Sequence, residues 1–202
     1  MEHQHNQQNK TAFVLGNGTS RNKLKLEHLQ KFAKVYACNA IYREYDPDYL
    51  IAVDVKMVNE IVSAGYHKTH EVWTNPNKGV STKSYLHFFS PHKGWSSGPT
   101  ALWFASQHNY KEIYIFGFDY QGLDGKFNNV YANTFNYKKS SDTATFFGNW
   151  LNQTATVIKE NPRVNYVRVV DTNGFIPDKL NGLPNLRHMN YEMFASKFPE
   201  CI

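Results

Sequence analysis

The chain has 202 residues, 41% of them hydrophobic and 15% aromatic, which is enough for one sizeable core but too few for two full domains. Its 22 Lys and Arg residues against 17 Asp and Glu residues give a formal net charge of +5, which favours anionic partners, nucleotides and phosphosugars among them. The longest apolar runs, such as residues 113–118, are far shorter than the roughly 20 residues that span a bilayer. We therefore expect one domain over residues 11–202 and no integral membrane segment.

Residues 1–10 are polar and lack both the periodicity of a folded element and the apolar segment of a secretory signal. We expect a disordered tail there and a cytoplasmic protein. Two cysteines, Cys38 and Cys201, are too few for a disulfide framework or a cysteine-based zinc site. The nine histidines show no H-x-x-x-H or H-E-x-x-H pairing, so we also expect no metal.

Short apolar runs alternate with amphipathic segments along the chain. The runs predict strands at residues 12–16, 35–38, 49–53, 71–74, 112–116 and 166–170. Helical spacing predicts helices at 24–33, from 55 to Gly65, and at 97–108, 142–161 and 192–197. Loops are expected at 75–95, 118–140 and 171–190. Strands that alternate with helices predict an α/β fold, namely a Rossmann-like, doubly wound and mainly parallel sheet.

In open parallel sheets, ligands bind beyond the carboxyl ends of the strands, where loops and helix N-termini converge. The sequence places polar residues or glycines directly after four of the predicted strands. They are Asn17, Gly18 and Ser20 after the first strand, Asn39 after the second, Asp54 after the third, and Gly117 and Asp119 after the fifth. We expect these residues to lie around one pocket.

The segment Gly16–Ser20 reads Gly-Asn-Gly-Thr-Ser, and its glycines let the backbone approach a ligand closely. It matches neither the G-x-G-x-x-G fingerprint nor a P-loop, so a tight structural turn is the alternative interpretation. Ser96, Ser97 and Gly98 open another predicted helix, where hydroxyl groups and free amides favour an anion, although helix capping alone would explain Ser97. Asp119 can accept sugar hydroxyls or simply begin a turn.

A further acidic pair, Asp46-Pro47-Asp48, has the D-x-D spacing of the metal-binding motif in one class of glycosyltransferases. The central proline favours an ordinary turn instead.

The combination of motifs resembles the bacterial sialyltransferases that use CMP-sialic acid to decorate lipooligosaccharide. The similarity covers about residues 12–160 and extends more distantly to a domain of motility-associated glycosylation factors and to 6-hydroxymethylpterin diphosphokinases. Gly16–Ser20 is similar to the family's G-N-G-P-S loop, and Cys38-Asn39 to its C-N pair. Asp54 falls where the family has Asn. Ser96–Gly98 resembles T-S-G, and Asn109–Asp119 closely matches G-Y-K-E-I-Y-L-S-G-I-D.

The resemblance implies a metal-independent glycosyltransferase without a further cofactor. It would move a sugar from a nucleotide donor, CMP-linked in the family, to a hydroxyl of an unknown glycan or small-molecule acceptor. It implies that the nucleotide is held by Asn17, Gly18, Ser20, Asn39, Asp54, Ser96, Ser97, Gly98, Gly117, Asp119 and Tyr120.

The resemblance also implies a general base, and here the chain departs from the family. Lys139 stands where the family has a catalytic His, and lysine is a poor base unless its pKa is lowered by several units. Lys139 would more naturally neutralise a phosphate, together with the family-like tyrosines Tyr120 and Tyr131. His92, in the loop before Ser96, is the alternative base.

Two interpretations from other classes stay open. One is a pterin diphosphokinase-like phosphotransferase, which would need ATP and Mg²⁺. The other is a nucleotide- or nucleic-acid-binding module without catalysis, although the scattered basic residues do not favour nucleic acid. The oligomeric state is also open, with a homo-oligomer among the alternatives.

Overall fold

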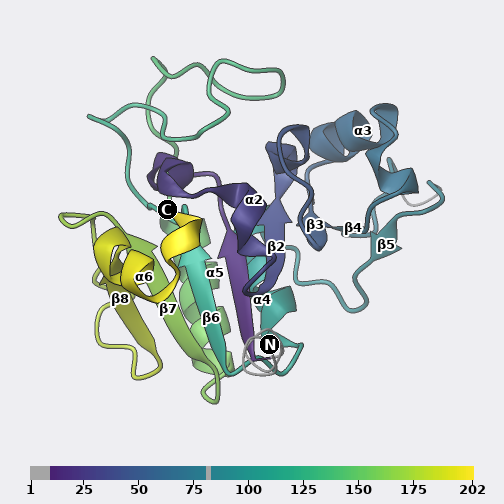
Figure 1. The fold of residues 1–202 in the computed structure, drawn as a ribbon. Coiled ribbons are helices and arrows are strands. Elements are labelled where there is room, and N and C mark those ends of the chain that lie inside the picture. The colour runs from purple at the N-terminus through teal and green to yellow at the C-terminus, as the bar shows by residue number, and fades with distance from the viewer. Residues whose placement is uncertain (1–9, 81–82) are drawn as a thin grey trace.

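The protein forms one eight-stranded sheet in which every strand pair is parallel (Figure 1). The computed structural model describes residues 10–80 and 83–202, so nearly all of the expected polar tail at 1–10 lies outside the described residues. The strand order is β5-β4-β3-β2-β1-β6-β7-β8. The strands are β1 (Thr11–Leu15), β2 (Lys34–Cys38), β3 (Tyr49–Ile51), β4 (Val72–Thr74), β5 (His87–Phe88), β6 (Glu112–Phe116), β7 (Asn165–Val170) and β8 (Leu186–Asn190). The predicted α/β, Rossmann-like fold class is confirmed.

Helices cover both faces of this sheet. They are α2 (Leu26–Leu29), α3 (Val55–Ser63), α4 (Ser97–Ser106), α5 (Gly148–Glu160) and α6 (Tyr191–Lys197). Short 3-10 turns add η1 (Thr19–Lys23), η2 (Asn39–Arg43), η3 (Tyr66–Lys68) and η4 (Pro199–Cys201). In Figure 1, α4 and α5 lie behind the sheet, and α2 and α6 lie in front of it. No helix in the described part of the chain is long and apolar enough to cross a bilayer.

The central strand β1 is buried on both faces, which explains its uninterrupted apolar sequence. Successive side chains of a strand point to opposite faces, so Phe13 and Leu15 join the core layer that contains Phe194 of α6. Ala12 and Val14 join the opposite layer, which contains residues of α4 and α5. One strand thus supplies both halves of the core.

The chain reverses its direction of travel across the sheet between β1 and β6. From β1 it builds β2 to β5 on one side, and it then returns through α4 to place β6 against the other edge of β1. The loops after β1 and β6 therefore leave the same end of the sheet as neighbours. In parallel sheets such a switch point is where ligands bind.

Two expected loops contain edge strands, and this is a correction. Residues 75–95 include the two-residue strand β5, and residues 171–190 include β8. The sequence of β8, Leu-Arg-His-Met-Asn, has no apolar run because an edge strand is only partly buried.

Two expected helices are shorter than predicted. The segment 24–33 contains only the single turn α2, because the Lys25 N–H donates to the Cys201 carbonyl instead of continuing a helix. The helix expected at 142–161 begins at Gly148, because the backbone at Asp142 and Ala144 is bonded to Phe127 and Gly125.

Replacement of Phe13 by Ala tests the importance of the central core layer. The Phe13 ring packs edge-on against Tyr114, Phe116 and Phe198 at centroid distances of 5.4 to 5.7 Å. We expect Phe13→Ala to lower the free energy of unfolding by about 3–5 kcal/mol in urea denaturation. The matched control is Phe135→Ala, whose side chain is 74% exposed and should change stability by no more than about 0.5 kcal/mol. Equal effects of the two substitutions would contradict this description of the core.

Candidate functional site

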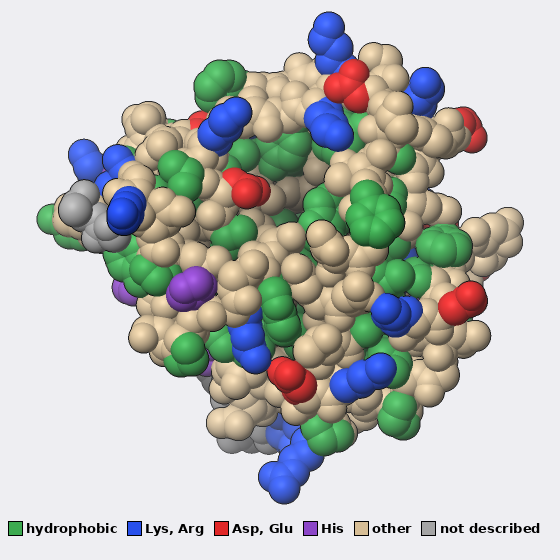
Figure 2. Space-filling model, turned by 180° about the vertical axis from the view of Figure 1, so that it is seen from behind, with side chains coloured by type: hydrophobic (Ala, Val, Ile, Leu, Met, Phe, Trp, Pro, Cys, Tyr) green, Lys and Arg blue, Asp and Glu red, His purple; other side chains and the backbone are tan. Residues whose placement is uncertain are grey.

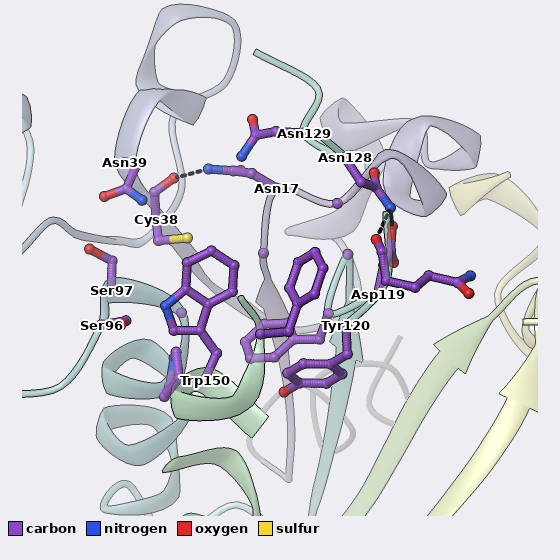
Figure 3. Close-up of a pocket in the computed structure, with 18 of the residues that line it drawn as sticks. Asn17, Cys38, Asn39, Ser96, Ser97, Asp119, Tyr120, Asn128, Asn129 and Trp150 are labelled. Atoms are coloured by element: carbon purple, nitrogen blue, oxygen red, sulfur yellow. Dashed lines mark hydrogen bonds between the residues drawn. The ribbon is translucent and has the colours of Figure 1, made fainter. Parts of the chain in front are cut away.

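A cavity of about 300 Å³ opens at the switch point of the sheet. Its walls come from the loops after β1, β2, β3 and β6, from the first turn of α4 and from the start of α5. Figure 2 shows this rear side of the molecule, where the surface is hollowed and hydrophobic side chains are visible inside the hollow. Figure 3 shows the cavity in detail.

Ten of the residues predicted from the sequence line this one cavity. They are Asn17, Gly18, Asn39, Asp54, Ser96, Ser97, Gly98, Gly117, Asp119 and Tyr120. The expectation that loops after separate strands gather around one pocket is therefore confirmed. Ser20 is not part of the wall, but its hydroxyl donates to Asp119 Oδ1 at 2.5 Å.

The three residues predicted to be catalytic do not line the cavity. The Tyr131 hydroxyl donates to Glu44 Oε1 at 2.5 Å and accepts from Arg21 Nη2 at 2.7 Å. Lys139 and His92 are exposed on loops. Their catalytic roles stay predictions, because none of the three side chains lines the cavity.

Sequence reasoning missed the aromatic wall of the cavity and several of its amides. The aromatic residues are Phe118, Phe127, Phe147 and Trp150, and the amides are Gln121, Asn128 and Asn129. Most of them belong to the connection between β6 and α5, whose length and aromatic, Asn-rich composition were the available signal. Trp150 lies in the first turn of α5. The helix was predicted to begin at residue 142, so the sequence did not indicate that Trp150 lies at its N-terminal end.

The Asp119 carboxylate joins the segment after β1 to the connection between β6 and α5 at the edge of the cavity (Figure 3). Besides the Ser20 hydroxyl, it accepts the Ser20 N–H at 3.2 Å and Asn128 Nδ2 at 3.1 Å. Asn128 Oδ1 in turn accepts the Thr19 N–H at 2.9 Å and the Thr19 hydroxyl at 2.8 Å. A carboxylate offers about four acceptor positions, and donors from the described residues occupy three of those of Asp119.

A buried arginine supports the same edge from beneath. Arg168 of β7 is only 2% exposed, and its Nε donates to the Phe118 carbonyl at 2.8 Å. Its Nη2 donates to the Asp119 carbonyl at 3.2 Å, and its guanidinium lies 5.3 Å from the Tyr120 ring centre. Burial lowers the pKa of Arg168, but an arginine in a protein stays protonated. A fixed positive charge therefore lies behind the backbone of Phe118 and Asp119, outside the cavity wall itself.

The first turn of α4 presents backbone N–H groups that have no partner within the helix. The helix begins at Ser97 and not after it, so Ser96 occupies the N-cap position and the alternative of Ser97 as a helix cap is wrong. Ser97 is 4% exposed, and its Oγ accepts the Val53 N–H at 3.1 Å. Such a helix start, with serine hydroxyls beside it, is suited to an anion.

Two asparagines at the cavity carry acceptor atoms that lack a partner. Asn17 is 7% exposed, and its Nδ2 donates to the Cys38 carbonyl at 3.1 Å (Figure 3). Its Oδ1 is buried and forms no hydrogen bond with any residue that the structure describes, and the same is true of Asn39 Oδ1. An unsatisfied buried acceptor costs free energy, which a bound donor group recovers.

The D-x-D segment lies elsewhere and has a structural role. Asp48 accepts Lys34 Nζ at 2.6 Å and the Val35 N–H at 2.9 Å, so it fixes the start of β2. Among residues 10–80 and 83–202, no group of three or more His, Cys, Asp or Glu side chains is arranged to hold a metal ion.

No protein-family model, curated protein or solved structure matches this chain.

The buried thiol of Cys38 provides a test of the cavity wall. Burial raises the pKa of Cys38 to about 12, so only about one thiol in ten thousand is ionised at pH 8. We expect native protein to resist alkylation of Cys38 by iodoacetamide at pH 8, as followed by peptide mass spectrometry, and urea-unfolded protein to react fully. Rapid alkylation in the native state would contradict the placement of this thiol.

Proposed function

We propose that the protein is a sialyltransferase-like glycosyltransferase that binds a nucleotide sugar, CMP-linked, in this cavity. The sugar would pass to an acceptor hydroxyl, and CMP would leave. The observation that carries the proposal is the meeting, in one cavity, of an aromatic wall, a carboxylate with a free acceptor position and a helix N-terminus. These three features match the base, the ribose and the phosphate of a nucleoside monophosphate.

The base would pack against the aromatic side chains of Phe147 and Trp150, because every nucleobase offers a flat face for stacking. The ribose hydroxyls would donate to Asp119, whose carboxylate is already oriented by Ser20 and Asn128. The phosphate would accept the N–H groups at the start of α4.

The same groups have a role in the reaction itself. When the bond between sugar and phosphate breaks, negative charge grows on the phosphate oxygen. Prearranged N–H groups at Ser97 and Gly98 would stabilise that charge, with Arg168 adding positive potential from below. None of the described residues that line the cavity is Lys, Arg or His, so the N–H groups at the start of α4 would be the direct contacts of the phosphate, which suits a single phosphate.

Calorimetric titration with CMP, UMP, GDP and ATP–Mg²⁺ tests the proposed ligand. We expect CMP to bind without added metal and more tightly than the other three nucleotides. Preference for ATP–Mg²⁺ would instead favour a phosphotransferase. Binding of an oligonucleotide with steep salt dependence, and no binding of CMP, would favour a nucleic-acid-binding module.

Replacement of Trp150 by Ala tests the aromatic wall. Loss of stacking costs about 1–3 kcal/mol per base, so we expect CMP affinity to fall by roughly 5- to 150-fold. Trp103→Ala is the matched control, because Trp103 lies on α4 but does not line the cavity. Calorimetry gives the affinities, and thermal unfolding shows that both variants are folded. Equal CMP affinity in Trp150→Ala and wild type would contradict the stacking role.

A further inference from the structure

A second cavity, of about 400 Å³, adjoins the first. Asn39 and Asp54 line both cavities, so these two residues form the boundary between them. The remaining wall comes from α3, through Lys56 and Met57, and from the connection between β6 and α5, through Asn136 and Tyr137. The second cavity therefore lies directly beside the first, with Asn39 and Asp54 facing both.

The wall of the second cavity is held by specific hydrogen bonds across α3 and η2. Asn136 Nδ2 donates to Glu60 Oε2 at 2.7 Å, and the Tyr137 hydroxyl accepts the Ala40 N–H at 3.4 Å. Arg43 Nη1 donates to Thr134 Oγ1 at 2.8 Å. These bonds fasten the long connection to α3 and η2, which form the opposite wall of the space. Its amides, its phenol ring and its single ammonium group suit a polyhydroxylated molecule better than an apolar one.

Asp54 is the carboxylate at the boundary, and its side chain has no partner in the described chain. It occupies the N-cap position of α3, where an aspartate commonly accepts a backbone N–H, yet it makes no such bond. No hydrogen bond or ion pair within residues 10–80 and 83–202 involves its carboxylate. The preceding N–H, that of Val53, donates to Ser97 Oγ at 3.1 Å, which holds this segment beside the start of α4.

We infer that the second cavity binds the acceptor of the transfer reaction and that Asp54 is the general base, an inference that rests on the proposed function. In this step the acceptor oxygen forms a bond to the anomeric carbon of the donor sugar. The bond from that carbon to the phosphate oxygen breaks, and its electron pair stays on the phosphate of CMP. The acceptor proton moves to the Asp54 carboxylate. The step needs no other reactant. With Asp54 as the base, neither Lys139 nor His92 is required to accept the proton.

The experiment compares wild type with Asp54→Asn. The probe donor is CMP-N-acetylneuraminic acid, the probe acceptors are lactose and water, and CMP release is measured against the rate without protein. We expect Asp54→Asn to lower kcat by about 10²- to 10⁴-fold for both acceptors. The Kd of CMP should stay within about twofold of the wild-type value, because the base acts on the acceptor. Asp54→Glu should restore part of the rate, since it retains a carboxylate.

Asp124→Asn is the matched control, because Asp124 is an exposed aspartate that lines neither cavity, and it should keep wild-type kcat. Wild-type kcat in Asp54→Asn would overturn the assignment of the base while leaving the proposed function intact. Loss of CMP binding in Asp54→Asn would overturn it as well, since Asp54 would then serve the nucleotide. Failure of wild type to bind CMP or to accelerate its release would overturn the proposed function and this inference together.

A second variant tests the acceptor cavity independently of the base. Lys56 is exposed, so Lys56→Trp fills part of the space without disturbing the core. We expect the KM for lactose to rise at least about tenfold while the Kd of CMP and the rate of transfer to water stay unchanged. An unchanged KM for lactose would overturn the placement of the acceptor.

Discussion

The contact between the loops after β1 and β6 is the constraint on which the site depends. The Gly16 N–H donates to the Phe116 carbonyl at 2.8 Å, and the Gly18 N–H donates to the Gly117 carbonyl at 2.9 Å. A Cβ atom on Gly16 would lie 2.7 Å from the Gly117 carbonyl oxygen, and Gly117 itself has a φ of +66°. Only because these backbones touch can the Asp119 carboxylate reach Ser20. The glycines are thus needed for the contact between the two loops, and this contact shapes the cavity.

A second layer of support makes that contact rigid. Arg168 donates to the carbonyls of Phe118 and Asp119, and a buried arginine without such acceptors would be strongly destabilising. Asn128 then joins the β6–α5 connection to Thr19 and Asp119. The hydrogen bonds run from β7 through the cavity edge to the loop after β1. A ligand therefore meets groups whose positions are already fixed, which reduces the entropy lost on binding.

Much of this arrangement could be predicted from sequence because it depends on local patterns. The apolar run before Gly117 specifies β6, and parallel strands bring their following residues, such as Asn17 and Asp119, to one end of the sheet. The rest depends on contacts that spacing does not encode. Tyr131 faces Glu44 and Arg21, partners far away in sequence, and the aromatic wall depends on how a long connection folds back over the sheet. The strand β8 was missed because its neighbour β7, and not its own composition, makes it extended.

The connection between β6 and α5 contributes to both cavities, through Asn128 and Asn129 in one and through Asn136 and Tyr137 in the other. Its two parts belong to one backbone segment, which in Figure 1 arches beyond the carboxyl ends of the strands. A molecule that restrains this segment in the first cavity also arranges the wall of the second. Thermodynamic linkage then requires the effect to be mutual and equal in size. Cooperativity between the two proposed substrates would then follow from the fact that one continuous segment contributes to both cavities.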